Sequence, residues 1–325
     1  MHPISELLKN KTFVLLSGEG TSVPLAEAKA LFLAYDANSN FETPEPKILI
    51  ANSTADPFLV GSRIAFARRV GPMFVDSEAA HDALRGLRIR FRCFDLVDGM
   101  APPDPEDYLQ DIDAVVDLRS PDRELTLVRG EKEYLSVSAP LAMKQGWYNR
   151  RPRNRPFFHP SAIFPKLSRA LVNLSRCKED EVFLDPFAGT GSLALEASIV
   201  GARVLALDLS ERMTRGSLAN MKHFGQDWLG VIRVDSALSP ITQVDAIATD
   251  VPYGRASSTR GRGTQEIIDL ALTSLSNSLK RGSMLVLMHP QTVGVNSTSE
   301  FEVEEEHNLH VHKRLTRTIT ILRRR

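Results

Sequence analysis

The stretch that decides the fold is VFLDPFAGTGSLALEASIVGARVLALD, residues 182–208. A short apolar run at 182–185 leads into the glycine-containing turn DPFAGTGS at 185–192, then into an apolar helical segment that ends in glycine at 201, and then into a second apolar run at 203–208. Apolar runs that alternate with helices predict parallel strands joined by right-handed crossovers. The sequence therefore predicts a doubly wound α/β sheet, whose ligands bind at the carboxyl ends of the strands.

The same alternation continues toward the C-terminus. A helix is expected at 210–225, with Ser210 as its N-cap and Gly225 as its C-terminal stop. Further strands are predicted at 230–235, 245–250 and 283–290, and one further helix is predicted at about 265–280. The tail differs, because FEVEEEHNLHVH (301–312) and RLTRTITILRR (314–324) have the pattern of two consecutive strands. A hairpin there leaves one strand of the sheet antiparallel.

The region before residue 143 has shorter and more mixed elements. A helix is predicted at 24–36, and strands are predicted at 11–17, 47–52, near 63–69, at 88–96 and, two or three in number, within 114–138. Mixed elements of this kind predict an α+β region made of two small units.

Charge is unevenly distributed along a chain whose formal net charge is zero. Of 325 residues, 40 are Lys or Arg and 40 are Asp or Glu, yet residues 143–176 hold eight basic side chains and no acidic one, whereas residues 1–142 are acidic overall. Four arginines stand among four aromatic residues in this block: Arg150, Arg151, Arg153 and Arg155, with Trp147, Tyr148, Phe157 and Phe158. Guanidinium groups pair with phosphates and aromatic rings stack on bases, which favours a nucleic-acid contact. The alternative is a solvated linker between domains.

The sequence contains no apolar run long enough to span a bilayer, and its start lacks the pattern of a signal peptide. Its two cysteines, Cys93 and Cys177, lie far apart without metal-binding spacing. We therefore expect a cytoplasmic protein with no membrane association and no disulfide framework.

Four predicted strands of this sheet end in an acid: Asp185, Asp208, Asp235 and Asp250. Gly189, Gly191 and Ala194 satisfy GxGxxA, so a dinucleotide site is one interpretation. The acid that precedes Pro186 opposes it, because a pyrophosphate would bring further negative charge. S-adenosylmethionine fits better, since it carries a cationic amino group and a free ribose.

In that interpretation the glycine turn admits the methionyl part of the cofactor. Asp208 accepts both ribose hydroxyls, and Asp235 and Ser236 flank the adenine.

Asp250, Val251, Pro252 and Tyr253 resemble the (D/N)PPY motif of amino-group methyltransferases, and DPFAGTG resembles their cofactor loop. An exocyclic amino nitrogen is a poor nucleophile because its lone pair is delocalised into the ring. Asp250 would accept a hydrogen bond from one N–H of the amino group, and the Val251 carbonyl would accept one from the other N–H. Tyr253 would stack on the extruded base. The alternative is an Asp-x-Pro turn with Tyr253 in the core.

Nearly the whole chain resembles the THUMP-domain RNA methyltransferases, and most closely the archaeal-type tRNA guanosine-10 N2-methyltransferases. FFHPSAIFPKLSRALVNLS (157–175) resembles the helix before that family's cofactor loop, and IDAVVDLRSPDRELTLV (112–128) resembles the end of a THUMP domain. One position departs from the family, because Val251 stands where DPPY has its first proline.

The resemblance implies a set of domains: a ferredoxin-like domain at 1–74, a THUMP RNA-binding domain at 75–143, a basic linker at 144–157 and a methyltransferase domain at 158–325. It also implies tRNA as partner, S-adenosylmethionine as cofactor and the N2 atom of a guanosine, at position 10, as the methyl acceptor.

The site residues follow from the motifs and the resemblance together. The catalytic set is Asp250, Val251, Pro252 and Tyr253. The expected cofactor-binding residues are Asp185, Phe187, Ala188, Gly189, Thr190, Gly191, Asp208, Leu209, Asp235, Ser236, Ala237, His159 and Ser161. The expected RNA-binding residues are Arg150, Arg151, Arg153, Arg155, Arg255, Arg260 and Arg262, the last three on a loop at 255–263 whose alternative is a disordered crossover.

No metal is expected, because His307, His310 and His312 fit a surface hairpin better than a metal site. We expect a monomer. Three other functions stay open: methylation of another tRNA guanine, of ribosomal RNA or of DNA adenine; RNA binding without catalysis; and a dehydrogenase.

Overall fold

The structure is a computed structural model that describes residues 10–18, 22–74, 77–110, 112–140, 146–252, 262–312 and 315–325. The chain forms two compact units. The first contains described residues of Met1–Glu19 and Leu31–Gly146, and the second contains those of Gly20–Ala30 and Trp147–Arg325. The finer division, with boundaries at 74, 143 and 157, stays a prediction.

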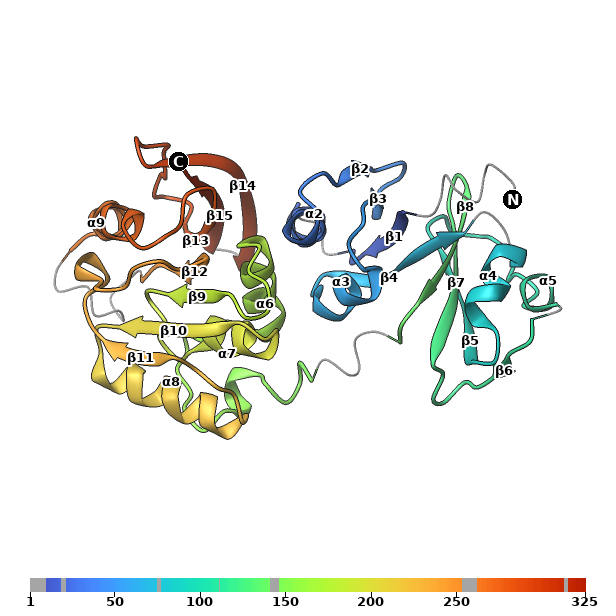
Figure 1. Ribbon diagram of the computed structural model, residues 1–325, viewed down its shortest axis with the longest axis horizontal. Helices are drawn as coiled ribbons and strands as arrows, with labels where there is room; N and C mark the ends of the chain where they lie inside the picture. The colour runs from blue at the N-terminus through green and yellow to red at the C-terminus, as the bar shows by residue number, and fades with distance from the viewer. Residues whose placement is uncertain are drawn as a thin grey trace. The chain divides into compact units, whose positions relative to one another are not determined.

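The first unit is built on an eight-stranded sheet (Figure 1). Its strands lie in the order β2 (Asn40–Glu42), β3 (Ile48–Asn52), β1 (Lys11–Leu16), β4 (Ala67–Phe74), β8 (Glu133–Ser138), β7 (Arg123–Arg129), β5 (Arg88–Asp95) and β6 (Val115–Val116). Its helices are α3 (Pro57–Arg63), α4 (Ser77–Leu84) and α5 (Glu106–Leu109), while α2 (Val23–Tyr35) has residues in both units. The mixed α+β character expected of this region is confirmed.

The strand predicted near 63–69 is wrong in its position. Residues 57–63 form helix α3, and the strand begins at Ala67. The helix has a start signal in the sequence, because Asp56 accepts a hydrogen bond from the Phe58 amide at 2.9 Å and Pro57 occupies the first helical turn. The strand predicted near residue 63 therefore begins only at Ala67, because the helix extends to Arg63 and residues 64–66 are not in a strand.

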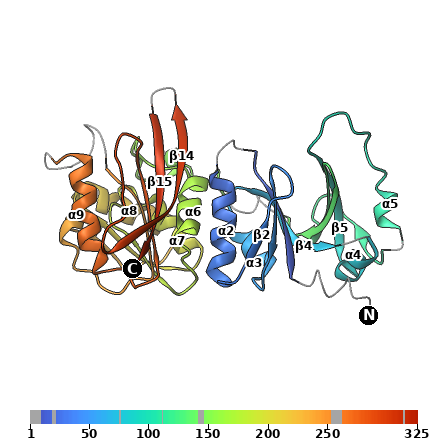
Figure 2. The ribbon, with the colours of Figure 1, turned by 90° about the horizontal axis from the view of Figure 1, so that it is seen from above.

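The second unit carries a seven-stranded sheet with helices on both faces (Figures 1 and 2). The strand order is β11 (Gly230–Arg233), β10 (Arg203–Asp208), β9 (Val182–Asp185), β12 (Ala246–Asp250), β13 (Met284–Pro290), β15 (Leu315–Arg324) and β14 (Phe301–His312). Strands β9 to β13 are parallel, and β15 runs antiparallel to both β13 and β14. The predicted doubly wound sheet with an antiparallel C-terminal hairpin is thereby confirmed.

Helices α6 (Pro165–Leu174) and α7 (Ser192–Ile199) cover one face of this sheet, and α9 (Thr264–Ser276) covers the other (Figure 2). Helix α8 (Glu211–His223) connects β10 to β11, and the described residues of the unit also form two 3₁₀ turns, η2 (Pro152–Asn154) and η3 (Ser236–Leu238). The predicted cap of α8 is present, since Ser210 Oγ accepts from the Met213 amide at 3.5 Å.

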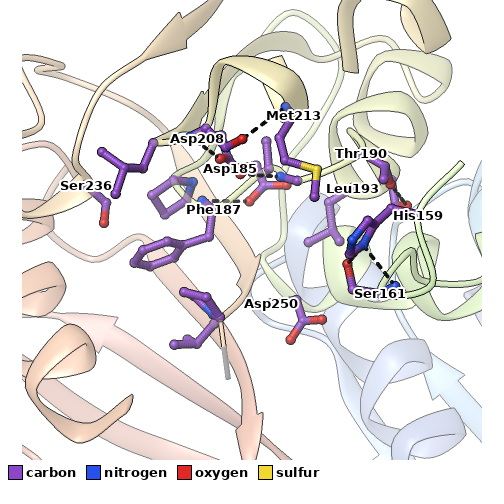
Figure 3. Close-up of a pocket in the computed structure, with 18 of the residues that line it drawn as sticks. His159, Ser161, Asp185, Phe187, Thr190, Leu193, Asp208, Met213, Ser236 and Asp250 are labelled. Atoms are coloured by element: carbon purple, nitrogen blue, oxygen red, sulfur yellow. Dashed lines mark hydrogen bonds between the residues drawn. The ribbon is translucent and has the colours of Figure 1, made fainter. Parts of the chain in front are cut away.

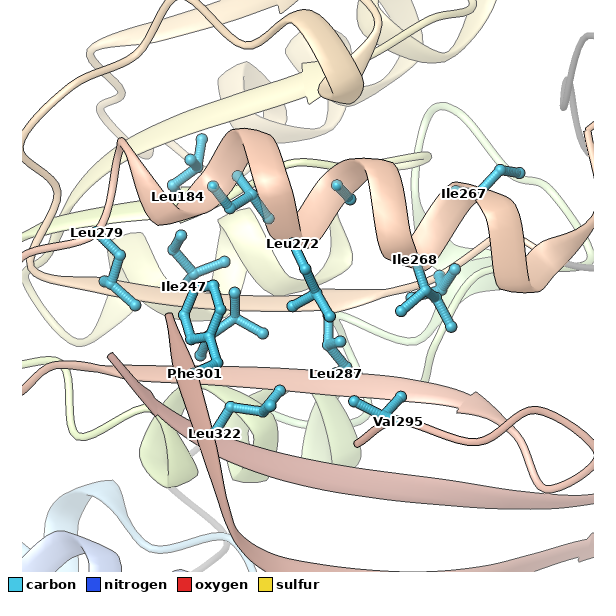
Figure 4. Close-up of a cluster of buried hydrophobic side chains, with 14 of the residues drawn as sticks. Leu184, Ile247, Ile267, Ile268, Leu272, Leu279, Leu287, Val295, Phe301 and Leu322 are labelled. Atoms are coloured by element: carbon cyan, nitrogen blue, oxygen red, sulfur yellow. The ribbon is translucent and has the colours of Figure 1, made fainter. Parts of the chain in front are cut away.

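A buried apolar cluster holds α9 against the sheet (Figure 4). Ile268 and Leu272 on the helix pack over Ile247 of β12 and Leu287 of β13, and Phe301 of β14 closes the cluster with no exposed surface. Burial of side chains of this size stabilises by about 1.5–3 kcal/mol each. The cluster therefore fixes the parallel half of the sheet, whose strand ends carry the acids, to the antiparallel hairpin.

Candidate active site

The acids at the carboxyl ends of the parallel strands lie around one pocket of about 370 Å³ (Figure 3). Parallel neighbours end at the same edge of a sheet, so Asp185, Asp208 and Asp250 come together although 65 residues separate the first from the last. Every predicted cofactor residue except Gly191 lines this pocket: Asp185, Phe187, Ala188, Gly189, Thr190, Asp208, Leu209, Asp235, Ser236, Ala237, His159 and Ser161. Of the predicted catalytic residues, Asp250, Val251 and Pro252 line it as well, and Tyr253 lies outside the described residues.

The glycine turn has two residues in the left-handed region, each for its own reason. Gly191 has φ +77°, and a Cβ there would lie 2.3 Å from Ser217 Oγ, so helix α7 starts against α8 only with glycine at this position. Gly189 has φ +52°, and a Cβ there would meet no atom within 4 Å. Its amide donates to Asp208 at 2.9 Å, which ties the turn to the end of β10.

Burial decides the electrostatics of the pocket. Asp185 is 1% exposed, and burial raises its pKa to about 7, although hydrogen bonds from Thr249 Oγ1 at 2.6 Å and from the Phe187 amide at 3.3 Å oppose the shift. Burial also raises the pKa of Asp208, against hydrogen bonds from the amides of Ser210 and Gly189. A pocket that gathers carboxylates in this way favours a ligand with positive charge.

Asp235 and Arg262 form the wall of the pocket near η3. Asp235 caps this turn by accepting from the Ala237 amide at 3.2 Å, and its second oxygen lies 3.1 Å from Arg262 Nη1. Arg262 lies in the pocket wall against a carboxylate, and its expected contact with RNA phosphate stays a prediction. The other two arginines of that predicted loop, Arg255 and Arg260, lie outside the described residues.

The Asp250 carboxylate is held by an arginine that the sequence did not single out. Arg317 of β15 donates through Nη1 to Asp250 Oδ2 at 2.8 Å and through Nη2 to Oδ1. Both side chains are largely buried, with exposed fractions of 7% for Arg317 and 16% for Asp250. Burial raises the pKa of Asp250, and the Arg317 charge opposes that shift. The amide of Val251 donates to the Met288 carbonyl at 2.9 Å, so the turn after β12 is fixed to β13.

Two of the four block arginines are buried, which corrects their expected role as phosphate ligands. Arg150 forms a two-point ion pair with Glu196 of α7, with Nε 2.7 Å from Oε1, and Arg155 donates to Ser192 Oγ at 2.6 Å. Arg169 of α6 reaches the same Glu196 at 2.8 Å. This buried charge cluster attaches the block to the helix that follows the glycine turn.

The remaining two block arginines, Arg151 and Arg153, are exposed. Arg151 lies over the ring of Tyr148, 4.9 Å from its centroid, and that tyrosine is 68% exposed. The stacked pair is the kind of surface that the sequence interpretation required.

His159 and Ser161 lie at one rim of the pocket, where His159 Nδ1 and Ser161 Oγ are 2.7 Å apart (Figure 3). His307, weighed above as a metal ligand, contacts Ser22 Oγ at 2.7 Å and Glu305 at 3.0 Å. In the described part of the chain, no three His, Cys, Asp or Glu side chains come together as a metal site, and no helix is long and apolar enough to cross a membrane.

Sequence reasoning missed several pocket residues. Met213, Leu193, Val234 and Ile267 line the pocket with apolar surface, but in the sequence each one belongs to an ordinary helical or strand pattern. Thr249, one residue before Asp250, is fully buried against Asp185 and could have been found as the single hydroxyl in the apolar strand β12.

This fold and this pocket define a Rossmann-like methyltransferase whose cofactor is S-adenosylmethionine. A glycine turn, acids at successive strand ends and an Asp-x-Pro turn after β12 surround one cavity, and the sheet ends in the antiparallel hairpin. The sequence matches the UPF0020 family, described as the RMKL-like methyltransferase domain, over residues 152–319. That is more than half of the chain, and the chain belongs to this family.

Curated relatives carry more specific names. The chain is similar to the tRNA (guanine(10)-N2)-dimethyltransferase of Methanothermobacter thermautotrophicus, with 35% identity over 222 residues that cover 66% of this chain and 65% of the relative. It is also similar to the protein of that name from Methanocaldococcus jannaschii, with 26% identity over an alignment of 362 residues that covers 95% and 99% of the two chains. The match thus spans just under two thirds of the first relative and nearly all of the second.

Among solved structures, the crystal structure of TrmN from Thermus thermophilus superposes with a TM-score of 0.51 at 18% identity, covering 97% of this chain and all of the other. At that identity the likeness concerns the fold alone. The resemblance noted in the sequence is confirmed by the curated relatives, whereas the THUMP assignment stays a prediction.

Proposed function

We propose that this protein transfers a methyl group from S-adenosylmethionine to the exocyclic N2 atom of a guanosine in tRNA, and that position 10 is the site. The observation that carries the proposal is the largely buried Asp250 carboxylate beside Val251 and Pro252, in the same pocket as the glycine turn. The names of the archaeal relatives support the choice of tRNA and of guanine N2.

The residues of the pocket fit the cofactor. Asp208 offers a carboxylate to the ribose hydroxyls at the end of β10, and Ser236 with Asp235 lies where the adenine would be flanked. The open space above Gly189 and the Asp185 carboxyl suit the methionyl group and its ammonium. When bound, S-adenosylmethionine supplies an electrophilic methyl carbon on a sulfonium.

Asp250 would accept a hydrogen bond from one N–H of the guanine amino group, and the Val251 carbonyl would accept the other. Both contacts pull the nitrogen lone pair out of conjugation with the ring and hold it toward the methyl carbon. The base must leave its stack to reach so buried a carboxylate, as in other enzymes that modify bases. We also propose a stacking role for Tyr253 against the extruded base.

Nucleoside mass spectrometry tests the proposed function. Unmodified tRNA transcripts are incubated with the full-length protein and labelled S-adenosylmethionine, and N2-methylguanosine and N2,N2-dimethylguanosine are quantified. The matched control is a tRNA with inosine at position 10, which lacks only the amino group. We expect label in the guanosine tRNA and none in the inosine tRNA. Label at another guanosine would keep the chemistry and change the position, and label in no guanosine would overturn the proposal.

Replacing Asp208 by alanine is expected to weaken S-adenosylmethionine and S-adenosylhomocysteine alike, by tenfold or more. Both ligands share the ribose diol, and a hydrogen bond to a charged group contributes about 1.5–3 kcal/mol. The same carboxylate also holds the Gly189 amide, so the turn loses an anchor as well. Calorimetry with both ligands measures the effect, and Asp227→Ala, at an exposed position, is the control. Unchanged affinities would place the ribose elsewhere.

The exposed arginines of the basic block are expected to contribute to tRNA binding. Arg151→Ala combined with Arg153→Ala should weaken tRNA binding. The slope of log affinity against log salt concentration should become shallower by up to about 0.7–0.9 per lost phosphate contact. A control pair with the same charge change is Arg203→Ala with Lys222→Ala, at exposed positions that start β10 and lie in the last turn of α8. Filter binding across a salt series measures both pairs. Equal slopes in the two double variants would remove the block from the tRNA interface.

A further inference from the structure

The ion pair behind the candidate catalytic carboxylate is the feature that the proposed mechanism leaves unexplained. The Arg317 side chain is buried, and its two Nη atoms face the two oxygens of Asp250 in a parallel, two-point arrangement. Asp250 lines the pocket, whereas Arg317 is not among the residues that line it. A guanidinium is planar, and a two-point contact fixes the plane of a carboxylate as well as its charge.

Strand pairing puts the arginine there. In the sheet, β15 lies between β13 and β14, and Arg317 stands opposite Pro290 on one side and Leu309 on the other. Strand β12 lies on the far side of β13, so the side chain reaches across β13 to the end of β12. The contact therefore joins the antiparallel hairpin to the turn that the (D/N)PPY-like motif forms.

Other titratable groups surround the pair. Asp185 of β9 interacts electrostatically with Asp250 and Asp208, and its burial raises its pKa to about 7. On the other side, His289 of β13 feels the positive charge of Arg317 and the negative charge of Glu306 on β14. His289 Nε2 lies 2.9 Å from Thr320 Oγ1, which lies 3.1 Å from Glu306. Arg317 thus contacts one carboxylate of the pocket and interacts electrostatically with this buried histidine.

We propose that Arg317 is the positioning residue of the reaction: it fixes the plane of the Asp250 carboxylate and keeps it ionised, so that a free lone pair of the carboxylate points at the guanine amino group. The proposal rests on the proposed function, because it assumes that Asp250 accepts from that amino group. Two guanidinium contacts leave each carboxylate oxygen with further acceptor capacity.

The chemistry explains why a paired carboxylate suits this step. The N2 lone pair of guanine forms the nitrogen–carbon bond while the carbon–sulfur bond breaks and its electrons stay on sulfur, which leaves S-adenosylhomocysteine. The nitrogen then carries one proton too many, and that proton passes to Asp250 and on to solvent. A methylated aryl-type ammonium is a far stronger acid than a carboxylic acid, so even a weakly basic carboxylate can take the proton. Orientation and ionisation before the attack are therefore what the site must provide.

Burial alone would work against that requirement. In the absence of a counter-charge, a carboxyl as buried as Asp250 shifts toward its neutral form, in which one oxygen carries a proton and no longer accepts from an amino group. Asp185, which interacts electrostatically with Asp250, adds negative charge when it is ionised, and this favours the neutral form of Asp250 further. Arg317 opposes both effects.

The test compares three variants on the same strand by single-turnover methylation of tRNA across pH. Arg317→Met removes the charge and the two-point contact, Arg317→Lys keeps the charge and loses the planar contact, and Arg323→Met is the control, since Arg323 pairs with Glu304 at a partly exposed position of β15. For Arg317→Met we expect the acid limb of the pH–rate profile to move up by at least one pH unit. For Arg317→Lys we expect a rate about tenfold lower at every pH with the limb unmoved, and for Arg323→Met no change.

A second readout needs no bound cofactor. Chemical unfolding of the free protein at pH 5 and pH 8 should show that Arg317→Met loses stability relative to the wild type as pH rises. The reason is that a carboxyl with a raised folded-state pKa binds more protons folded than unfolded, and this stabilisation is lost at higher pH. Affinity for S-adenosylhomocysteine should stay within twofold of the wild type in all three variants.

The outcomes separate the two proposals. If the wild type forms no N2-methylated guanosine, the proposed function fails first. If the wild type is active and Arg317→Met keeps both its rate and its acid limb, the positioning role of Arg317 is wrong and the proposed function stands. Should Arg317→Met not fold, Arg317→Lys decides alone: a wild-type rate would overturn the inference, and a slower rate with unchanged affinity for S-adenosylhomocysteine would support it.

Discussion

Asp250→Ala is expected to lower the single-turnover rate of methyl transfer by roughly 10²–10³-fold, the usual cost of removing one pre-positioned hydrogen-bonding group from a reaction centre. The same change should destabilise the fold by about 3–5 kcal/mol, because it removes the carboxylate that a buried guanidinium contacts at two points. That guanidinium belongs to Arg317, whose side chain is 7% exposed. Rapid-quench methylation and urea unfolding measure the two effects, and affinity for S-adenosylhomocysteine should change little.

A double variant separates catalysis from stability. Combining Asp250→Ala with Arg317→Met removes both charges, and replacing a whole buried ion pair by apolar groups is often neutral for stability. We expect the double variant to regain most of the lost unfolding free energy and none of the lost rate. Recovery of methyl transfer in that variant, or near-normal turnover in Asp250→Ala itself, would contradict a role for this carboxylate in the reaction.

Glu196→Gln is expected to be the most destabilising single substitution away from the pocket, at about 3–5 kcal/mol. Glu196 has no exposed surface and is paired with Arg150 at 2.7 Å and with Arg169 at 2.8 Å. Arg155 lies in the same cluster, and burial lowers its pKa to about 10, with Glu196 opposing that shift. An amide in place of the carboxylate removes the negative charge that Arg150 and Arg169 contact and that Arg155 interacts with electrostatically. Urea unfolding measures the loss.

Glu211→Gln is the matched control, because Glu211 also contacts two arginines but is half exposed. Pairs of that kind contribute between 0 and about 1 kcal/mol. Equal losses of unfolding free energy in the two variants would mean that burial does not determine how much the charge cluster contributes to stability. A further consequence is expected at the pocket: Arg155 bonds to Ser192, the first residue of α7, so Glu196→Gln should also weaken cofactor binding.

The sequence was sufficient to predict the parallel half of the site. Short apolar strands ending in acids, with a glycine turn after the first, place Asp185, Asp208 and Asp250 at one edge of a sheet by topology alone, and the structure brings them to one pocket. Local rules decided this outcome: strand period, turn chemistry and the right-handed crossover. Helix caps such as Ser210 followed from equally local signals.

Long-range pairing is what the sequence did not reveal. The basic block contains no acid within residues 143–176, so its arginines were expected at the surface. The carboxylate that pairs with two of them is Glu196, which lies twenty residues after the end of the block. Arg317 is 67 residues from Asp250 and stands in an alternating strand where nothing distinguishes it from Arg323. Which arginine reaches Asp250 depends on the register between strands, and register is a property of the folded sheet.

The hairpin order also has a consequence for how this enzyme becomes active as the chain is made. Strand β15 follows β14 in the sequence but lies between β13 and β14 in the sheet. During synthesis β13 can form its native pairing on that side only after β15 has emerged, because its neighbour in the sheet is β15 and not β14. The acids and the glycine turn of the cofactor pocket all come from earlier residues, whereas Arg317 arrives with the inserting strand. A nascent chain could thus hold cofactor before it can orient Asp250, and methyl transfer would begin only when the sheet is complete.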